Sequence, residues 1–143
     1  MFLKHQTPDE RLNVWRDFRH LSDLTVEKIL VEFSNIKVCS RCMDFYTPDS
    51  WPTVFEIVRE GYFCQSGITL VLTATLYNAG IITSDEITFY VISNHITGST
   101  GLVLEFENQV YNAVPGKTIS VDQLQNISTI YTRHTIAISK LFS

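Results

Sequence analysis

A long uncharged stretch, Gly61 to Gly80, constrains the fold of this chain more than any other part of the sequence. Its apolar residues recur with the 3.6-residue period of a helix, which places Cys64, Ile68 and Leu76 on one face and threonines on the opposite face. Gly80 stands where helices commonly end in a left-handed residue. We therefore expect one buried helix across this stretch, with the other elements packed around it.

Chain length and composition favour a single folded domain. A chain of 143 residues is of ordinary domain size and can bury a core without disulfides or metal ions. Hydrophobic residues make up 45% and charged residues 18%, so we expect residues 1–143 to form one globular domain. The net charge of −4 and the lack of a dense Lys/Arg cluster argue against nucleic acid as a partner.

The same sequence features argue against membrane insertion and against a bound cofactor. The uncharged run carries too many threonine, serine, asparagine and glutamine residues for a membrane span. The N-terminal residues lack the layout of a signal peptide, so we expect a cytoplasmic location with reduced cysteines. The glycines are isolated and form no phosphate-binding loop, and we expect no cofactor.

Three further helices are predicted before the central stretch. Thr7, followed by Pro8 and two acidic residues, is a strong start for a helix that runs to about His20. Ser22 or Thr25 caps a second helix with an apolar stripe. Thr53 with Glu56 has the spacing of a capping box and begins a short third helix. Helices should therefore fill residues 8–80, apart from an ordered loop over residues 38–52.

Beyond Gly80 the hydrophobic period changes from 3.6 to 2, which indicates strands. We expect turns at Glu107-Asn108 and Pro115-Gly116, and a long closing strand over 127–138. Helices first and strands afterwards is the α+β layout. The predicted fold is α+β, with N-terminal helices (residues 8–80) packed on a C-terminal antiparallel β-sheet (residues 87–138).

Cys64 is the sharpest catalytic candidate. A cysteine in the first turn of an apolar helix meets unpaired backbone N–H groups, which favour the nucleophilic thiolate. A nucleophile needs a base and an orienting group, and His95 and Asn112 in the predicted sheet supply both residue types. The alternatives are a plain core role for Cys64, an exposed His95 and a turn-forming Asn112. His134, in the closing strand, is a substitute base.

This order of residues, a cysteine on a helix, a histidine after one strand and an asparagine on the next, resembles the transglutaminase-like branch of the papain-type cysteine enzymes. The resemblance covers about residues 61–112 and departs from the family pattern where His95 opens a loop. It implies acyl transfer or amide hydrolysis, with Cys64 as nucleophile, His95 as base and Asn112 as orienting residue.

Cys39 and Cys42 have the spacing of half a zinc site or of a redox pair. A zinc site needs two more ligands, and the nearby candidates His5, His20 and Cys64 are not paired in the sequence. A redox pair would open a helix after a strand, which the following polar stretch does not provide. Two reduced thiols without a role remain the simplest interpretation, and we expect no metal site.

A second resemblance concerns residues 49–57, Asp-Ser-Trp-Pro-Thr-Val-Phe-Glu-Ile, together with the later segments 61–64 and 110–112. These segments are similar to short uncharacterised proteins of large tailed bacteriophages. The resemblance implies a small viral accessory protein in the host cytoplasm. On this hypothesis the chain is non-catalytic and binds a host or phage protein, or forms a homo-oligomer. The exposed aromatic residues expected to make the contact are Trp15, Tyr46 and Trp51.

Overall fold

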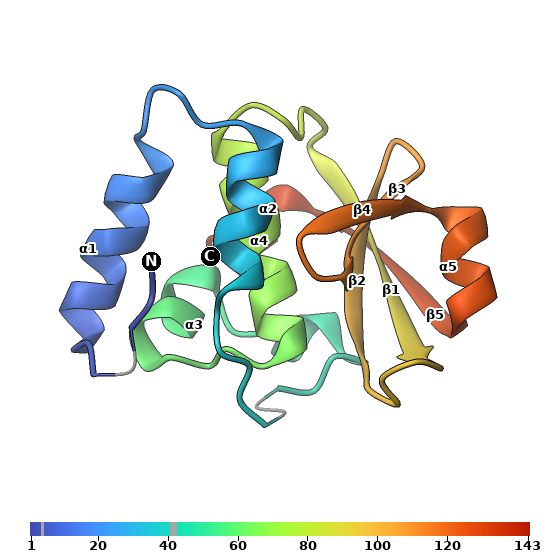
Figure 1. Cartoon of the computed structure of the whole chain (residues 1–143). Coiled ribbons are helices and arrows are strands. Elements are labelled where there is room, and N and C mark those ends of the chain that lie inside the picture. Colours follow the sequence, from blue (N-terminus) through green and yellow to red (C-terminus); the bar gives the residue numbers. More distant parts are fainter. Residues whose placement is uncertain (4, 41–42) are drawn as a thin grey trace.

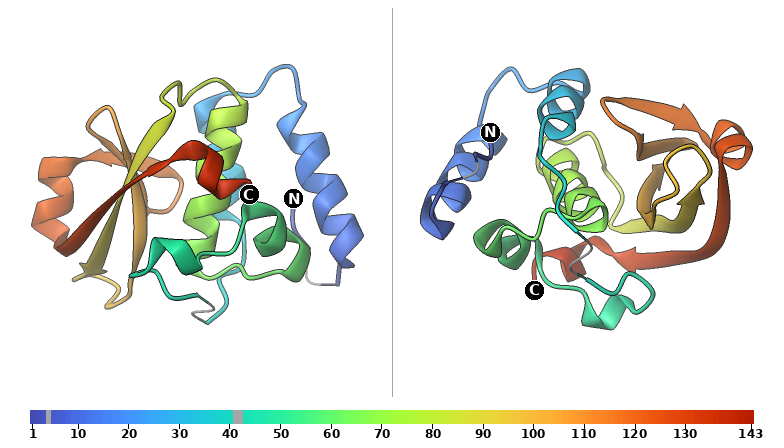
Figure 2. Two further views of the ribbon diagram at one scale, coloured as in Figure 1. Left: turned by 180° about the vertical axis from the view of Figure 1, so that it is seen from behind. Right: turned by 60° about the horizontal axis from the view of Figure 1, so that its bottom comes forward.

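The computed structural model describes residues 1–3, 5–40 and 43–143, and it has the predicted α+β architecture (Figure 1). Helix α4 lies between the other N-terminal helices and the sheet, and α5 lies at the far side of the sheet (Figures 1 and 2). The helices are α1 (Pro8–Arg19), α2 (Val26–Ser34), η1 (Pro48–Ser50), α3 (Val54–Glu60), α4 (Gln65–Asn78), α5 (Val121–Ile127) and η2 (Ile138–Leu141). The strands are β1 (Glu86–Asn94), β2 (Thr100–Phe106), β3 (Gln109–Val114), β4 (Lys117–Ser120) and β5 (Ser128–Ala137).

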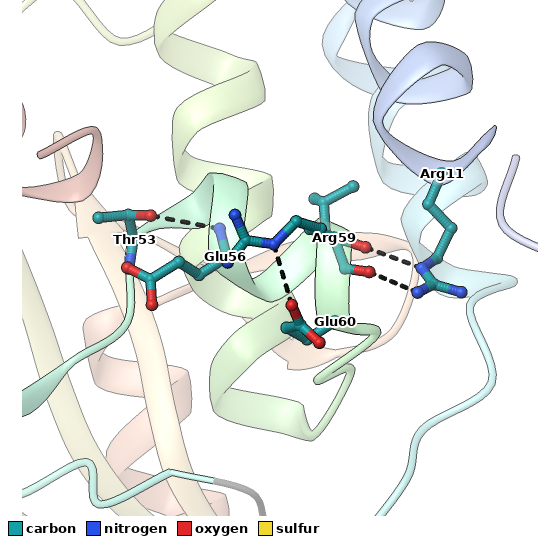
Figure 3. Close-up of polar contacts among 6 residues, drawn as sticks. Arg11, Thr53, Glu56, Arg59 and Glu60 are labelled. Atoms are coloured by element: carbon teal, nitrogen blue, oxygen red, sulfur yellow. Dashed lines mark hydrogen bonds and ion pairs between the residues drawn. The ribbon is translucent and has the colours of Figure 1, made fainter. Parts of the chain in front are cut away.

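The first three α-helices begin at the predicted caps. The hydroxyl groups of Thr7 and Thr25 each accept a backbone N–H from the third residue that follows, at 3.2 Å in both cases. Thr53 and Glu56 form the complete capping box, in which each side chain bonds the other residue's backbone N–H (Figure 3). Side-chain oxygens thereby satisfy backbone donors that a helix start leaves unpaired.

The prediction of one helix from Gly61 to Gly80 is wrong at its beginning and confirmed at its end. Gly61 has a φ of 74° and ends α3, so the chain turns before α4 begins at Gln65. Gly80 has a φ of 77°, and the N–H of Ile81 bonds back to the carbonyl of Leu76. Glycine is needed at both places because side chains rarely adopt this left-handed conformation.

Helix α4 is buried on all sides, as the sequence predicted. Every side chain from Ser66 to Leu76 is buried. Its threonines fit this apolar setting because their hydroxyls donate to carbonyls one turn earlier, as Thr73 does to Thr69 at 2.7 Å and Thr75 to Val71 at 2.8 Å. The main hydrophobic core contains side chains from α1 to α4 and from β1 to β3, so the helical and strand halves share it.

The sheet is antiparallel, with strand order β4-β3-β2-β1-β5. The turn predicted at Glu107-Asn108 joins β2 to β3, and both residues have a positive φ. The sequence analysis missed β4 and α5, which occupy residues 117–127. Ser120 and Gln123 form a capping box at the start of α5, a signal that the sequence contained. A smaller core cluster lies where α5 covers the outer face of the sheet.

Within the described residues, no helix combines the length and apolar character that a membrane span requires.

Arg11 of α1 holds the last turn of α3 in place (Figure 3). Its guanidinium group donates to the carbonyl of Val58 at 2.9 Å and also to the carbonyl of Arg59. A cation at the C-terminal end of a helix opposes the negative end of the helix dipole. Arg11 therefore links α1 to α3, two helices that are distant from each other along the chain.

Replacing Arg11 with methionine should lower the free energy of unfolding by about 1.5–3 kcal/mol, because hydrogen bonds from a charged donor are lost. The measurement is urea denaturation of both proteins. Arg16→Met on the same helix is the matched control, since Arg16 is exposed and its ion pair is with the neighbouring Asp17. An equal loss in both variants would contradict the bridging role of Arg11.

Candidate functional site

The sheet is split between β2 and β3, and the principal candidate site lies in this split. Residues Leu104 to Phe106 of β2 pair with residues 109–111 of β3, and the described register between the two strands stops there. Just beyond, the pairing of β3 with β4 shifts register, and Asn112 has a φ of 71°. Asparagine is among the few residue types that tolerate this conformation, so the sequence permits the bend that carries β3 away from β2.

Where β3 no longer pairs with β2, side chains from the first turns of α4 form hydrogen bonds with the backbone of β2 instead. The N–H of Leu102 donates to Ser66 Oγ at 3.0 Å. The carbonyl of Leu102 accepts Gln65 Nε2 at 2.6 Å and Thr69 Oγ1 at 2.8 Å. A strand that loses its neighbour would otherwise bury unpaired polar groups. These bonds allow β2 to stay in the sheet while β3 turns away.

Asn112 connects the displaced strand to the same helix. Its Nδ2 donates to the carbonyl of Gln65 at 3.2 Å and to Thr69 Oγ1 at 2.8 Å. Asn94, at the end of β1, is buried, and its Nδ2 donates to the carbonyl of Ala113 at 3.4 Å. Its Oδ1 accepts two backbone N–H groups of the following turn, residues 95–99. The carboxamide side chains of Gln65, Asn94 and Asn112 thus hold the split in place.

The split opens into a cavity of about 260 Å³, which we call the split-sheet cleft. Its walls come from α2, the start of α4, the turn after β1, and β2 and β3. No described residue that lines it is charged or carries an imidazole. The lining residues are Phe33, Ser34, Ile36, Val38, Gln65, Ile68, Ile92, Asn94, Thr97, Ser99, Gly101, Asn112, Ala113 and Pro115.

Gly101 leaves the space that the Gln65 side chain occupies. A Cβ atom at position 101 would lie 1.9 Å from Gln65 Oε1 and 2.9 Å from Ser66 Oγ.

The Gly101→Ala variant should displace the Gln65 carboxamide, break its bond to Leu102 and lower the free energy of unfolding by about 1–2 kcal/mol. Urea denaturation of the two single variants and of the double variant with Gln65→Ala tests this relation. In the double variant the loss should be smaller than the sum of the two single losses in free energy of unfolding, because removing the Gln65 carboxamide relieves the clash. A loss equal to that sum would contradict this relation.

Cys64 is the N-cap of α4 rather than a residue of its first turn. Its side chain is 2% exposed, and its Sγ accepts the N–H of Gly67 at 3.4 Å. It lines a smaller cavity of about 190 Å³ together with Cys39, and that cavity shares Gln65 and Ser99 with the split-sheet cleft. The sulfur therefore lies beside the candidate site but is almost completely covered.

His95 and Asn112 occupy different surroundings. His95 is exposed in the turn after β1, as the sequence suggested, and its Nε2 lies 2.7 Å from Thr129 Oγ1 of β5. Asn112 lines the split-sheet cleft and bonds the helix that Cys64 caps. Within the described part of the chain, no hydrogen bond joins Cys64, His95 and Asn112 to one another. The catalytic triad thus stays a prediction.

Cys64 should resist iodoacetamide in the native protein, because alkylation needs an accessible thiolate and this sulfur is buried. Cys39 is exposed and serves as the internal reference in peptide mass spectrometry. Protection of Cys64 should end when urea unfolds the protein. Rapid labelling of Cys64 below neutral pH in the folded state would instead favour the catalytic hypothesis.

The three aromatic residues predicted to be exposed differ in their surroundings. The prediction is wrong for Trp15, which is 0% exposed because its ring fills the core and its Nε1 donates to Thr75 Oγ1 at 3.0 Å. Trp51 is half-buried, with edge-to-face contacts to Phe89 and His134. Tyr46 is 49% exposed, as expected. A binding role for Tyr46 or Trp51 stays a prediction.

The spacing of Cys39 and Cys42 suggested a metal or redox role as one alternative, and Cys42 lies outside the described residues. Among the residues that are described, no group of three or more His, Cys, Asp or Glu side chains is placed to hold a metal ion. The described residues thus offer no metal centre beside the split-sheet cleft.

Sequence reasoning missed Gln65 and Asn94, which shape the cleft more directly than Cys64 does. A glutamine at the start of an otherwise apolar helix was the available signal, because a buried carboxamide must find hydrogen-bond partners. Comparison with models of known protein families and with curated protein sequences gives no match.

Proposed function

We propose that this chain is a small non-catalytic accessory protein of bacteriophage type that binds a partner protein in the split-sheet cleft. The partner is a host or phage protein, and the place of action is the host cytoplasm. The phage assignment rests on the sequence pattern around Trp51, Cys64 and Asn112. The binding assignment rests on the cleft, whose uncharged and largely apolar lining is the observation that carries the proposal.

The size of the cleft supports a protein partner. Small-molecule and cofactor pockets usually measure about 300–1,000 Å³. The split-sheet cleft, at about 260 Å³, is smaller than that range and suits a single inserted side chain. Anchor side chains that enter a preformed pocket supply much of the energy of protein–protein binding. Val38 at the rim is 58% exposed and extends the apolar surface that a partner would cover.

The cysteine-enzyme alternative has less support. Covalent catalysis needs a nucleophile within hydrogen-bond reach of its base. Cys64 is covered and bonded to Gly67, while the His95 imidazole is bonded to Thr129 on β5. Among the described residues that line the cleft, none has an ionisable group that could act as a general acid or base. A binding function needs none of these groups.

The proposal can be tested by selecting peptides from a random displayed library on the immobilised protein. Selected peptides should share an apolar anchor residue without a charge beside it, because a charge would lose hydration in the uncharged cleft. Their affinity should be constant between about pH 5 and pH 9, since none of the lining residues that the structure describes has an ionisable side chain.

Ser34→Phe is the variant that fills the cleft, because Ser34 is exposed at its rim and its hydroxyl donates to the carbonyl of Val31 within α2. Asn126→Phe is the matched control, since it adds the same ring to exposed α5 outside the cleft lining. The proposal predicts that Ser34→Phe abolishes peptide binding and that Asn126→Phe retains it. Equal binding by both variants would overturn the cleft as the site.

A further inference from the structure

The orientations of two carboxamides determine what the split-sheet cleft offers to a ligand. Asn112 Nδ2 faces the carbonyl of Gln65, and Gln65 Nε2 faces the carbonyl of Leu102. A backbone carbonyl can only accept a hydrogen bond, so the atom that faces it must be the donor nitrogen. Both nitrogens are therefore engaged with protein, and in each side chain the oxygen is the atom left for other contacts.

The oxygen of Asn112 is available for a further hydrogen bond. Within the described residues Asn112 Oδ1 has no hydrogen-bond donor, and it is not one of the buried polar atoms that lack a partner. It therefore remains accessible to solvent on a residue that lines the cleft. Gln65 Oε1 lies beside Gly101 and has one long contact, with Ser66 Oγ at 3.4 Å. Asn112 thus brings an accessible carbonyl-type acceptor to the largely apolar lining of the cleft.

A ligand that covers these oxygens must supply a donor. Covering an acceptor without a partner leaves it unsatisfied, which costs more than the net gain of an ordinary hydrogen bond. An ammonium or guanidinium group could donate, but the described part of the lining offers no counter-charge, and a buried unpaired charge is unfavourable. A mainly apolar side chain that ends in an uncharged hydrogen-bond donor supplies the donor without burying a charge.

We infer that the anchor of the partner is an aromatic side chain with a donor, tyrosine or tryptophan, and that Asn112 Oδ1 accepts its O–H or N–H. This inference rests on the proposed function, because it names the side chain that enters the cleft. Tyrosine and tryptophan combine a large apolar surface with one polar group that usually finds a partner when buried. They are also the aromatic residues that most often dominate protein interfaces.

Two pairs of capped amino acids test the inference in the unaltered protein. N-acetyl-tyrosine amide and N-acetyl-phenylalanine amide differ by one hydroxyl group, and N-acetyl-tryptophan amide and its 1-methylindole analogue differ by one N–H donor. Binding is followed by ¹H–¹⁵N NMR titration, with the side-chain NH₂ signals of Asn112 and Gln65 as local probes. The donor-bearing member of each pair should bind about five- to tenfold more tightly.

The variant Asn112→Gly removes the acceptor and keeps a residue that accepts a positive φ. In this variant the tyrosine and phenylalanine amides should bind with equal affinity. The control variant Asn126→Phe should still bind the tyrosine amide more tightly than the phenylalanine amide. If phenylalanine amide binds the cleft of the unaltered protein as tightly as tyrosine amide, the inference is overturned and the proposed function stands. If none of the four compounds shifts signals of cleft residues, both fail. The wild-type comparison decides the inference even if Asn112→Gly does not fold.

Discussion

Trp15→Ala is expected to lower the free energy of unfolding by about 3–5 kcal/mol, the cost of removing a fully buried aromatic side chain. The ring is 0% exposed, donates to Thr75 and packs edge-to-face against Phe55 with ring centroids 5.7 Å apart. The guanidinium group of Arg19 lies over its face at 3.9 Å. Urea denaturation measures the loss, and many domains of this size have only about 5–15 kcal/mol to lose.

Two further variants separate the contributions of Trp15. Trp15→Phe retains most of the buried ring but loses the bond to Thr75, so about 1–2 kcal/mol should be lost. Leu21→Ala, just beyond the same helix, removes a side chain that is 51% exposed and should cost less than about 1 kcal/mol. A loss below about 1 kcal/mol in Trp15→Ala would show that Trp15 is exposed, as the sequence first suggested.

Gly67→Ala should lower the free energy of unfolding by about 2–3 kcal/mol, although alanine is the better helix former. In an ordinary helix this change gains up to about 1 kcal/mol. Here the new Cβ would lie 2.3 Å from the backbone carbonyl oxygen of Tyr62 and 3.4 Å from Ile57 Cγ2. The clash with Tyr62 cannot be relieved by a side-chain rotation, because it involves backbone, so the turn before α4 must shift.

Asn78→Ala provides the control for helix propensity in the same helix, since Asn78 is exposed in its last turn. This variant should gain a few tenths of a kcal/mol. Thermal or urea denaturation of the two variants should therefore give changes of opposite sign. Stabilisation by Gly67→Ala would mean that the turn over residues 61–64 does not approach α4 closely, and the position of Cys64 would have to be reconsidered.

Local signals in the sequence were sufficient for most of the helical half. Thr7, Thr25 and Thr53 cap their helices by short-range hydrogen bonds, which depend on residues only three positions away. The same kind of signal at Ser120 would have located α5. The 3.6-residue period also predicted the buried helix α4, but it did not show that this helix begins at Gln65 instead of directly after Gly61.

The candidate site was less predictable, because it depends on contacts between distant residues. Cys64 and Asn112 were selected for their chemistry. Cys64 does cap α4, and Asn112 of β3 does bond to the first turn of that helix. The split between β2 and β3 and the space left by Gly101 follow from tertiary packing that no local pattern encodes. Trp15 was misjudged because hydrophobic periodicity identifies the buried face of a helix but not how completely that face is covered.

The most direct test of the split-sheet cleft is an NMR titration with N-acetyl-phenylalanine amide, an uncharged apolar probe, on wild-type protein and Ser34→Phe. We expect saturable shifts in the wild-type protein that are confined to residues lining the cleft, including the side-chain NH₂ signals of Gln65, Asn94 and Asn112. The same shifts should be absent in Ser34→Phe and present in Asn126→Phe. Saturable shifts that lie elsewhere on the molecule, or that persist unchanged in Ser34→Phe, would contradict the account.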